Sequence, residues 1–359
     1  MYSFKVYSGE KEIWEMLEKF LTHVDERYNS MYQSEVWDKI ISSAIGKGRA
    51  RFLCLLKNDE IIMASIGYMY PLKGKYYWMY LSRGPIVHRK YTKEYSQLVD
   101  IFLKLGRDRL TKDCVWIRLD PLMEEGIITP HGRLRKAHKS VHPDSTLVLD
   151  LTLSEAELLA QMKEKGRYNI KLSAKKDVKV SGFVWDGKQY KKIFGDLKLR
   201  EPLDAYDHII HETTIRDGFH SHSKKYLDNF LKQSSKNGLL LLAEFEGEVI
   251  SGGIFYHDDR IFYYYYGASS NSHRNVMAPY ALQWSAICYA KEHTTCTSYD
   301  FLGVANDFEN TKDPLYGVTQ FKSKFGGKVL RTCGTFEYVT NSFLYAFVLL
   351  VKWTLGLFK

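Results

Sequence analysis

The sequence predicts an α+β fold of two tandem units, each a mixed β-sheet with flanking helices. Short runs rich in β-branched and aromatic residues alternate with tight polar turns, which is typical of strands and hairpins. The same order of elements occurs twice along the chain, which indicates an internal repeat. The length of 359 residues, 45% of them hydrophobic, is sufficient for two separate cores.

The first copy begins near residue 51. It reads RFLCLLK, a turn at Asn58 and Asp59, EIIMASIGYMYP, YYWMYLSRGPIV, a helix-like stretch from Lys93 to Arg109, and the strand VWIRLDP. Strands joined by short polar turns favour an antiparallel meander, and a helix followed by one more strand indicates a crossover connection. The last strand carries Asp120.

The second copy begins near residue 239. It reads LLLLAEFE, a turn at Glu246 and Gly247, VISGGIFYH, IFYYYYGASS, a helix-like stretch from Pro279 to Glu292, and the strand SYDFLG, which carries Asp300. The order of elements in both copies resembles the core of the GNAT acyltransferases. We therefore expect two tandem GNAT-like domains.

A basic helix is predicted between the copies, over residues 154–176. Ser154 and Glu157 form a capping box at its start. Apolar residues at helical spacing predict one buried face, made of Leu158, Met162, Ile170 and Ala174. The other face carries Lys163, Lys165, Arg167, Lys171, Lys175 and Lys176. This basic face either contacts phosphates of a nucleic acid or is a solvated surface.

Two further features complete the outline of the chain. A second basic cluster, made of Arg133, Arg135, Lys136, His138, Lys139 and His142, is either a phosphate contact or an ordinary loop. We expect a first domain over residues 1–150, a second over 151–340 that contains the basic helix, and a hydrophobic tail over 341–359. The tail either lies at a membrane interface, with Trp353 and Lys352 at the headgroups, or packs as a terminal helix on the second domain.

The composition limits the class of protein. A formal net charge of +9 favours polyanionic partners such as nucleic acid, nucleotide-linked molecules or an anionic membrane. The five cysteines show no CxxC or Cys/His spacing, so we expect neither a disulfide framework nor a metal site. No signal peptide and no apolar stretch long enough to span a bilayer is recognisable, which predicts a cytoplasmic protein.

Nine segments carry a likeness to a known family. They are YQSEVWDKI, LSRGPIV, IRLDP, MKEKGRYNIKLSAKKDV, RDGFHSHS, YYYYGASS, APYALQW, YDFLGV and GVTQFKSKFGG. In this order they resemble the Fem family of aminoacyltransferases, over almost the whole chain. Staphylococcal members have a long coiled-coil arm, whereas only the short stretch from Val180 to Leu203 stands in its place here. The chain is therefore most similar to the shorter FemX-type members, without such an arm.

The resemblance implies a function and its partners. The enzyme would transfer an amino acid from aminoacyl-tRNA to the stem peptide of a peptidoglycan precursor, lipid-linked or UDP-linked, in interpeptide bridge formation. The first domain would hold the precursor in a groove, the basic helix would contact tRNA, and no cofactor would be needed. Peripheral contact with the inner face of the cell membrane is a further expectation.

Two other classes of function stay open. An N-acyltransferase with a small thioester donor is the alternative, but neither copy has the Gly-rich turn that holds the pyrophosphate of coenzyme A. A basic RNA-binding module without catalysis is the third class, and it would not need the lysine discussed next.

The resemblance also implies roles for single residues. In QFKSKFGG, Lys322 matches a family lysine that follows a phenylalanine, here Phe321, and its ammonium would stabilise the oxyanion. Asp120 aligns with a family aspartate near the acceptor amine, although an aspartate before proline is also common turn chemistry. Arg216 matches an arginine that engages the anionic precursor, with an ion pair to Asp217 as the plain alternative.

The remaining candidates are substrate contacts. The family places a lysine that meets the precursor's diphosphate at the position where Ile41 stands here. Lys39, two residues earlier, is expected to take its place. Tyr264 and Tyr266 lie two apart on a strand, so they would share one face and reach the substrate with their hydroxyls. His220 is either a minor substrate contact or a spectator. No Ser/His/Asp or Cys/His arrangement stands out, so the attacking group is expected to be the acceptor amine itself.

Overall fold

The computed structural model describes residues 1–110, 112–218 and 220–354. It divides into two compact units, one formed by Met1–Asp144 and the chain from Arg331 onward, the other by Ser145–Leu330. The expected borders lay after residues 150 and 340. The units divide earlier at both places, because residues 145–150 form a strand of the second sheet and residues 336–339 a strand of the first.

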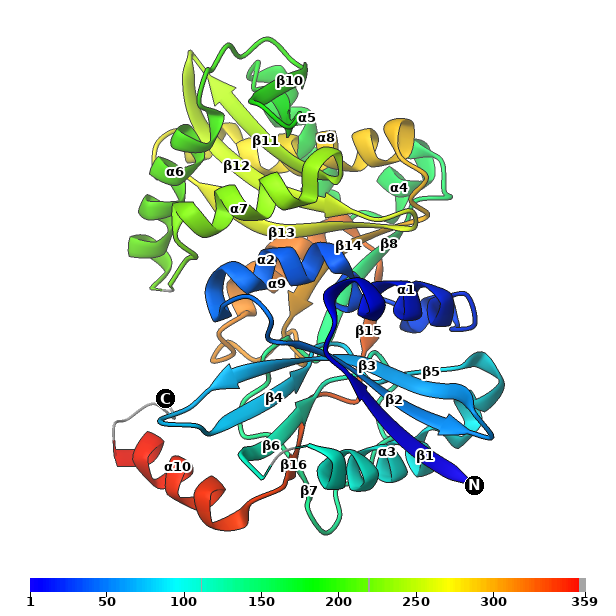
Figure 1. Cartoon of the computed structure of the whole chain (residues 1–359). Coiled ribbons are helices and arrows are strands. Elements are labelled where there is room, and N and C mark those ends of the chain that lie inside the picture. The colour runs from blue at the N-terminus through cyan, green and yellow to red at the C-terminus, as the bar shows by residue number, and fades with distance from the viewer. Residues whose placement is uncertain (111, 219, 355–359) are drawn as a thin grey trace. The chain divides into compact units, whose positions relative to one another are not determined.

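The first unit is built on a mixed sheet (Figure 1). The strand order is β1 (Tyr2–Tyr7), β2 (Ala50–Lys57), β3 (Glu60–Pro71), β4 (Tyr77–Leu81), β6 (Cys114–Leu119), β16 (Phe336–Val339) and β7 (Leu134–Lys136), and β5 (Ile86–Val87) pairs with β3. Strands β4 and β6 are parallel and are connected through α3 (Tyr95–Arg109), whereas β1 to β4 form an antiparallel meander. The predicted crossover unit is therefore confirmed.

Helices cover both faces of the first sheet. On one face, α3 buries Leu98 and Phe102, and the ring of Phe102 meets Phe4 of β1 edge-on, with centroids 5.0 Å apart. On the other face, α1 (Glu10–Leu21) and α2 (Glu35–Ile45) contribute to a second core around Phe52. Apolar residues at helical spacing on each helix explain this arrangement.

The second unit repeats the pattern. Its strand order is β10 (Tyr190–Phe194), β9 (Lys179–Trp185), β11 (Gly238–Phe245), β12 (Glu248–His257), β13 (Ile261–Ser269), β14 (Ser298–Val304), β8 (Ser145–Asp150) and β15 (Lys328–Arg331). Strands β13 and β14 are parallel and are connected through α8 (Ala278–His293). Tyr206 of α6 (Pro202–Asp217) approaches Gly252 and Leu282 of α8 approaches Gly253, so the two helices cover opposite faces of β12.

The tight turns of the two meanders have the predicted positions and the same geometry. Asn58 and Asp59 have φ values of 53° and 64°, and Glu246 and Gly247 have values of 53° and 83°. Two successive left-handed residues are the requirement of a type I′ hairpin, whose twist matches that of the strands it joins. The repeat found in the sequence is thus present in the backbone.

The predicted basic helix is divided into two. The capping box of Ser154 and Glu157 is present at the start of α4 (Glu155–Gln161), but Met162 and Lys163 are extended, and α5 (Glu164–Lys175) begins after them. The backbone N–H of Lys163 donates instead to the carbonyl of Lys324 at 3.0 Å. The continuous helix over 154–176 is therefore corrected to two helices joined at this contact.

The predicted apolar face is confirmed at Leu158 and Met162, which are buried, and at Ile170, which packs against the same core, but Ala174 is exposed. The fully buried residues of α5 are Gly166, Asn169 and Ser173. A Cβ on Gly166 would lie 2.4 Å from the carbonyl oxygen of Lys324, so only glycine permits this close approach. The contact is made by small and polar residues, which an apolar pattern cannot reveal.

The segment from Val180 to Leu203 forms the β9–β10 hairpin, a loop and the start of α6. In the part of the chain that the structure describes, no helical arm is inserted at this place.

The predicted tail contains α10 (Ser342–Thr354). One side packs on the first unit rather than on the second: Tyr345 is buried, and Leu344, Val348 and Leu349 contact a cluster that includes Trp116 of β6. The other side is exposed and apolar, with Phe343, Phe347, Leu350, Val351 and Trp353 between 38% and 80% exposed. Within the described ranges, every helix is too short or too polar to cross a bilayer.

Candidate active site

A buried carboxylate at the end of β6 is the centre of a polar cluster in the first unit. Strands β4 and β6 are parallel with Leu81 opposite Leu119, so the residues that follow both strands meet. Asp120 is 1% exposed and accepts three hydrogen bonds. Its Oδ1 accepts from the backbone N–H of Arg83 at 2.8 Å. Its Oδ2 accepts from the hydroxyl of Tyr80 at 2.8 Å and from Nδ1 of His142 at 2.6 Å.

The charges of this cluster follow from burial and from these contacts. Burial by itself raises the pKa of Asp120, but His142, Arg83 and the hydrogen bonds outweigh it and hold that pKa below its ordinary value. Burial lowers the pKa of His142, against the opposing effect of Asp120. The cluster at neutral pH is therefore a carboxylate beside a neutral imidazole.

These charges also determine the tautomer of His142. An ionised carboxylate can only accept hydrogen bonds, so Nδ1 at 2.6 Å from Oδ2 must carry the proton. Nε2 then holds the lone pair. Tyr32, whose ring centroid is 4.4 Å away, and Tyr80 flank the imidazole and limit its orientation.

A buried lysine is the centre of the second unit's candidate site. Lys322 ends α9 (Tyr316–Lys322), is 6% exposed, and donates from Nζ to the carbonyl of Gly303 at 2.7 Å. Gly303 lies in β14 beside a bulge in which Leu302 has a φ of 58°. Burial lowers the pKa of Lys322 to about 8, although Asp300 acts in the opposite direction. The lysine is therefore a cation held in a largely apolar environment at neutral pH.

Aromatic rings pack together around the residue that precedes this lysine. Phe321 meets Tyr280 and Phe325 edge-on, at centroid distances of 5.2 and 5.4 Å. The ring of Tyr280 in turn stacks on Phe325 at 5.6 Å. Phe321 therefore has a packing role in this aromatic cluster. Burial strengthens the field of the Lys322 ammonium, because little water is present to screen it.

The predicted precursor contacts Lys39 and Arg216 form hydrogen bonds and ion pairs with other residues than those of the two clusters. Lys39 is half exposed on α2 and pairs with Glu35 at 2.9 Å. Arg216 donates from Nε and Nη2 to Asp217, at 2.7 and 2.9 Å, and from Nη1 to the carbonyl of Ser269 at 2.8 Å. The ion pair to Asp217 is thus present, and a substrate anion would have to displace it. His220 is exposed.

The two tyrosines of β13 do not share a face. A β-bulge shifts the register between them, so Tyr266 is opposite Ile254 and Tyr264 opposite Phe255. Tyr264 stacks on Phe255 at 5.3 Å, and burial raises its pKa to about 12. Tyr266 contacts Phe230 and His222 instead, at 5.8 and 5.3 Å. The prediction of one shared face is wrong, because strict alternation fails at a bulge.

Five of the six residues of the predicted basic face are the main tRNA candidates, and they differ in their side-chain contacts. Lys165, Lys171 and Lys175 are exposed on α5. Arg167 is half-buried and donates to the carbonyl of Met162, and Nζ of Lys163 donates to the hydroxyl of Ser323 at 3.3 Å. The first three therefore form an exposed basic face, whereas Arg167 and the likewise exposed Lys163 make contacts at the junction of α4 and α5.

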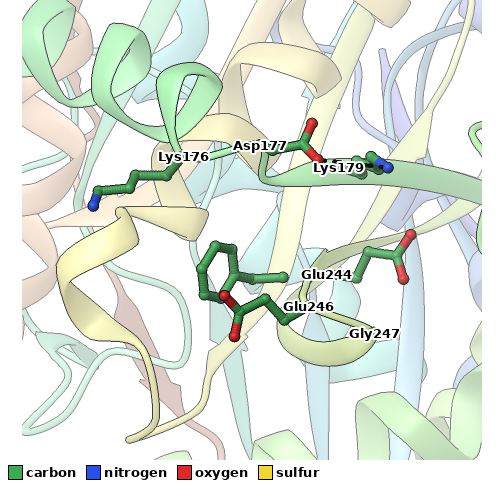
Figure 2. A pocket seen from close by; sticks show the side chains of 7 residues that line it. Lys176, Asp177, Lys179, Glu244, Glu246 and Gly247 are labelled. Atoms are coloured by element: carbon green, nitrogen blue, oxygen red, sulfur yellow. Dashed lines mark ion pairs between the residues drawn. The ribbon is translucent and has the colours of Figure 1, made fainter.

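A polar depression of about 310 Å³ lies at the C-terminal end of α5 (Figure 2). It is lined by Lys176, Asp177, Lys179, Glu244, Phe245, Glu246 and Gly247. Lys179 pairs with Asp177 at 3.6 Å, and Figure 2 shows Lys176 extending away from that pair. Charges of both signs surround the depression, and of the predicted basic face only Lys176 lines it, so we assign no substrate to it.

The sequence reasoning missed the most enclosed part of the candidate site. The sequence places His142 in a basic cluster that is either a phosphate contact or an ordinary loop, whereas in the structure its ring is bound to Asp120. The sequence around Tyr80 predicts a strand but gives no indication that its hydroxyl binds Asp120. Among the described residues, no group of His, Cys, Asp and Glu could hold a metal ion, and the five cysteines form no disulfide.

Comparison with known proteins gives related sequences and folds. The sequence model of the FemAB family matches residues 128–248 and 244–352. The lipid II:glycine glycyltransferase of Staphylococcus saprophyticus is 37% identical over 107 residues, which are 30% of this chain and 25% of that protein. The protein of the same name from Staphylococcus epidermidis is 33% identical over 130 residues, 35% of this chain and 31% of that protein. The matched parts thus span less than a third of these relatives.

Solved structures support the fold. A crystal structure of FemX has a TM-score of 0.72 at 18% identity, over 96% of this chain and 99% of that chain. A tandem GNAT protein from the clavulanic acid biosynthesis pathway has a TM-score of 0.53 at 10% identity, over 95% of this chain and 99% of that chain. At such identities the likeness concerns the architecture alone.

Proposed function

The chain belongs to the FemAB family, and on that premise we propose that it transfers an amino acid from aminoacyl-tRNA to an amino group of a peptidoglycan precursor. The relatives named as lipid II:glycine glycyltransferases support an acceptor of this class. The observation that carries the proposal is Lys322, a buried cation that follows Phe321 at the place where the resemblance implies a lysine after a phenylalanine.

The chemistry of this transfer assigns a task to Lys322. The acceptor amine attacks the carbonyl carbon of the aminoacyl ester, a C–N bond forms, and the C–O bond to the tRNA ribose breaks. A negative charge develops on the carbonyl oxygen and then on the leaving ribose oxygen. The ammonium of Lys322 stabilises both charges, because a buried cation interacts more strongly with them than an exposed one would.

The exposed basic face of α5 is the proposed contact for the tRNA. Lys165, Lys171 and Lys175 are solvent-accessible. Phosphate neutralisation by such residues supplies most of the sequence-independent affinity for nucleic acid. The formal net charge of +9 supports a polyanionic donor in the same way.

We also propose that the precursor is lipid-linked and that α10 lies at the membrane surface. Its exposed side is a continuous apolar stripe, with Phe343 and Trp353 80% and 70% exposed. The helix carries no acidic residue, and its one charged side chain is Lys352. An apolar stripe with an aromatic residue near one end is typical of helices that lie in the headgroup region. Lys352 does not belong to this stripe, because its ammonium lies over the ring of Trp116, 5.7 Å from the ring centroid.

An N-acyltransferase with a small thioester donor is the competing function. It is supported only by the likeness in architecture to a tandem GNAT protein. Calorimetric titration with acetyl-coenzyme A tests it: no heat of binding is expected, whereas binding in the micromolar range would favour this alternative.

The decisive experiment identifies donor and acceptor together. The purified protein is incubated with a pool of charged tRNAs and with either a lipid-linked or a UDP-linked pentapeptide precursor, and the products are weighed by mass spectrometry. A mass increase of one or more aminoacyl residues on the lipid-linked precursor is expected. If neither precursor gains mass with any charged tRNA, the proposed function is wrong.

A further inference from the structure

The aminoacyl transfer proposed above needs a base as well as a cation. An amine carries a proton at neutral pH, because its ordinary pKa is near that of lysine. It must lose that proton before it can attack an ester, so some group near the acceptor has to take it up. Lys322 is a donor and cannot take it while it is protonated.

The carboxylate of Asp120 is badly placed to be that base. Both of its oxygens already accept hydrogen bonds, Oδ1 from Arg83 and Oδ2 from Tyr80 and His142. The residue is 1% exposed. An incoming ammonium would have to displace these donors to reach it, and the partners would then be left buried and unpaired.

The imidazole of His142 has the properties that Asp120 lacks. Its side chain is 16% exposed, and its Nδ1–H is used to bind the carboxylate. Within the described ranges of the chain, Nε2 has no hydrogen-bond partner, and it is the nitrogen that holds the lone pair. A carboxylate that fixes the Nδ1–H tautomer and leaves Nε2 free is the arrangement that makes histidine a general base.

We propose that His142 is the general base that accepts the proton of the acceptor amine through Nε2, and that Asp120 is its positioning residue. This inference rests on the proposed function. The proton passes from the ammonium nitrogen to Nε2, the freed amine attacks the ester, and the resulting imidazolium is stabilised by Asp120. The imidazolium then returns the proton to water or to the departing ribose oxygen, so protons and charges balance.

The groups that face His142 are suited to this cycle. Asp120 at the end of β6 stabilises the protonated ring, and the guanidinium of Arg83, after β4, opposes protonation. Tyr80 of β4 and Tyr32 flank the ring, and burial together with Asp120 raises the pKa of Tyr80, so its hydroxyl stays neutral. The ring is thus neutral before the reaction and has a counterion when it becomes charged.

The test compares His142→Asn with wild type in the aminoacyl transfer assay. Asparagine keeps a side-chain N–H that can donate to Asp120 but has no basic nitrogen. We expect kcat at pH 7 to fall by about 10²- to 10⁴-fold, which is the usual contribution of a general base, with KM for the precursor little changed. In wild type, protonation of His142 at a pH below its ordinary pKa should lower kcat. This acidic limb of the pH profile is expected to be absent in His142→Asn.

Two further variants separate catalysis from structure. Exogenous imidazole is expected to restore activity to His142→Ala in proportion to its neutral fraction, an effect that a purely structural residue would not give. His131→Asn is the control: this histidine is 55% exposed and pairs with Asp100, so its replacement leaves kcat unchanged.

The outcomes separate the role of His142 from the proposed function. If wild type transfers an amino acid but His142→Asn retains its kcat and its acidic limb, the role of His142 is wrong and the proposed function stands. If His142→Asn is inactive but imidazole does not restore His142→Ala, the role as base is also wrong. If wild type transfers nothing, the proposed function fails, and the role of His142 fails with it.

Discussion

Among single residues, Lys322 makes the sharpest kinetic prediction. Replacing it with methionine keeps most of its packing and removes the charge, so the loss should appear in the transition state. We expect kcat to fall by about 10²- to 10³-fold while the Kd for the precursor changes little. Lys324→Ala is the matched control, because Lys324 lies two residues on in Ser323–Phe325 and is not buried. If Lys322→Met keeps nearly the kcat of wild type, the catalytic role proposed for Lys322 is wrong.

The same lysine predicts a dependence of stability on pH. Its pKa is about 8 in the folded protein and 10.5 in its ordinary state, so between these values the unfolded chain binds the proton and the folded chain has released it. Stability therefore rises with pH across this window, and the gap corresponds to roughly 3 kcal/mol. Urea unfolding should show wild type gaining on Lys322→Met from pH 7.5 to 10.5. Parallel pH curves for the two proteins would contradict this assignment.

At the scale of one element, α5 is expected to act through its exposed lysines. Changing Lys165, Lys171 and Lys175 to glutamate should weaken tRNA binding and reduce the slope of log Kd against log salt by about one for each lost contact. Lys188→Glu, Lys191→Glu and Lys192→Glu together are the charge-matched control on exposed positions of the β9–β10 hairpin. Equal effects in both triple variants would mean that only net charge matters.

The exposed stripe of α10 gives a second prediction for an element. Phe343→Gln, Phe347→Gln and Trp353→Gln together should abolish flotation with vesicles that contain anionic lipid. Folding should be unaffected, because the three side chains are 80%, 57% and 70% exposed. Ile215→Gln with Leu330→Gln is the control, since both residues are exposed apolar side chains on other elements. An unchanged bound fraction in the triple variant would remove the membrane contact.

Elements with a local signal could be predicted from the sequence. The type I′ turns at Asn58–Asp59 and Glu246–Gly247, the crossover helices α3 and α8 and the capping box at Ser154 all depend on neighbouring residues. The break between α4 and α5 and the bulge at Tyr265 could not be seen, since each is set by contacts with a distant segment or with a paired strand. His142 was missed for the same reason, because a loop brings it to Asp120.

At the scale of the whole molecule, the two units differ in continuity. The second unit is one stretch, Ser145–Leu330, whereas the first needs the residues from Arg331 onward. Strand β16 lies between β6 and β7, and Glu337 on it pairs with Arg118. A fragment of residues 145–330 is therefore expected to unfold cooperatively on heating, and a fragment of residues 1–144 is not. Circular dichroism melting of both fragments checks this, and a cooperative transition in residues 1–144 would contradict it.

The insertion of β16 between β6 and β7 has a consequence for biosynthesis. A ribosome delivers the chain from the N-terminus, so β6 and β7 emerge with an unfilled gap between them while nearly two hundred further residues are still being added. The second unit can close during this interval, although it is made later. The nascent first sheet meanwhile exposes two strand edges, which are a template for pairing with other chains. Slow translation through residues 145–330 would prolong that exposure, so the arrival of β16 decides whether the first sheet completes itself or aggregates.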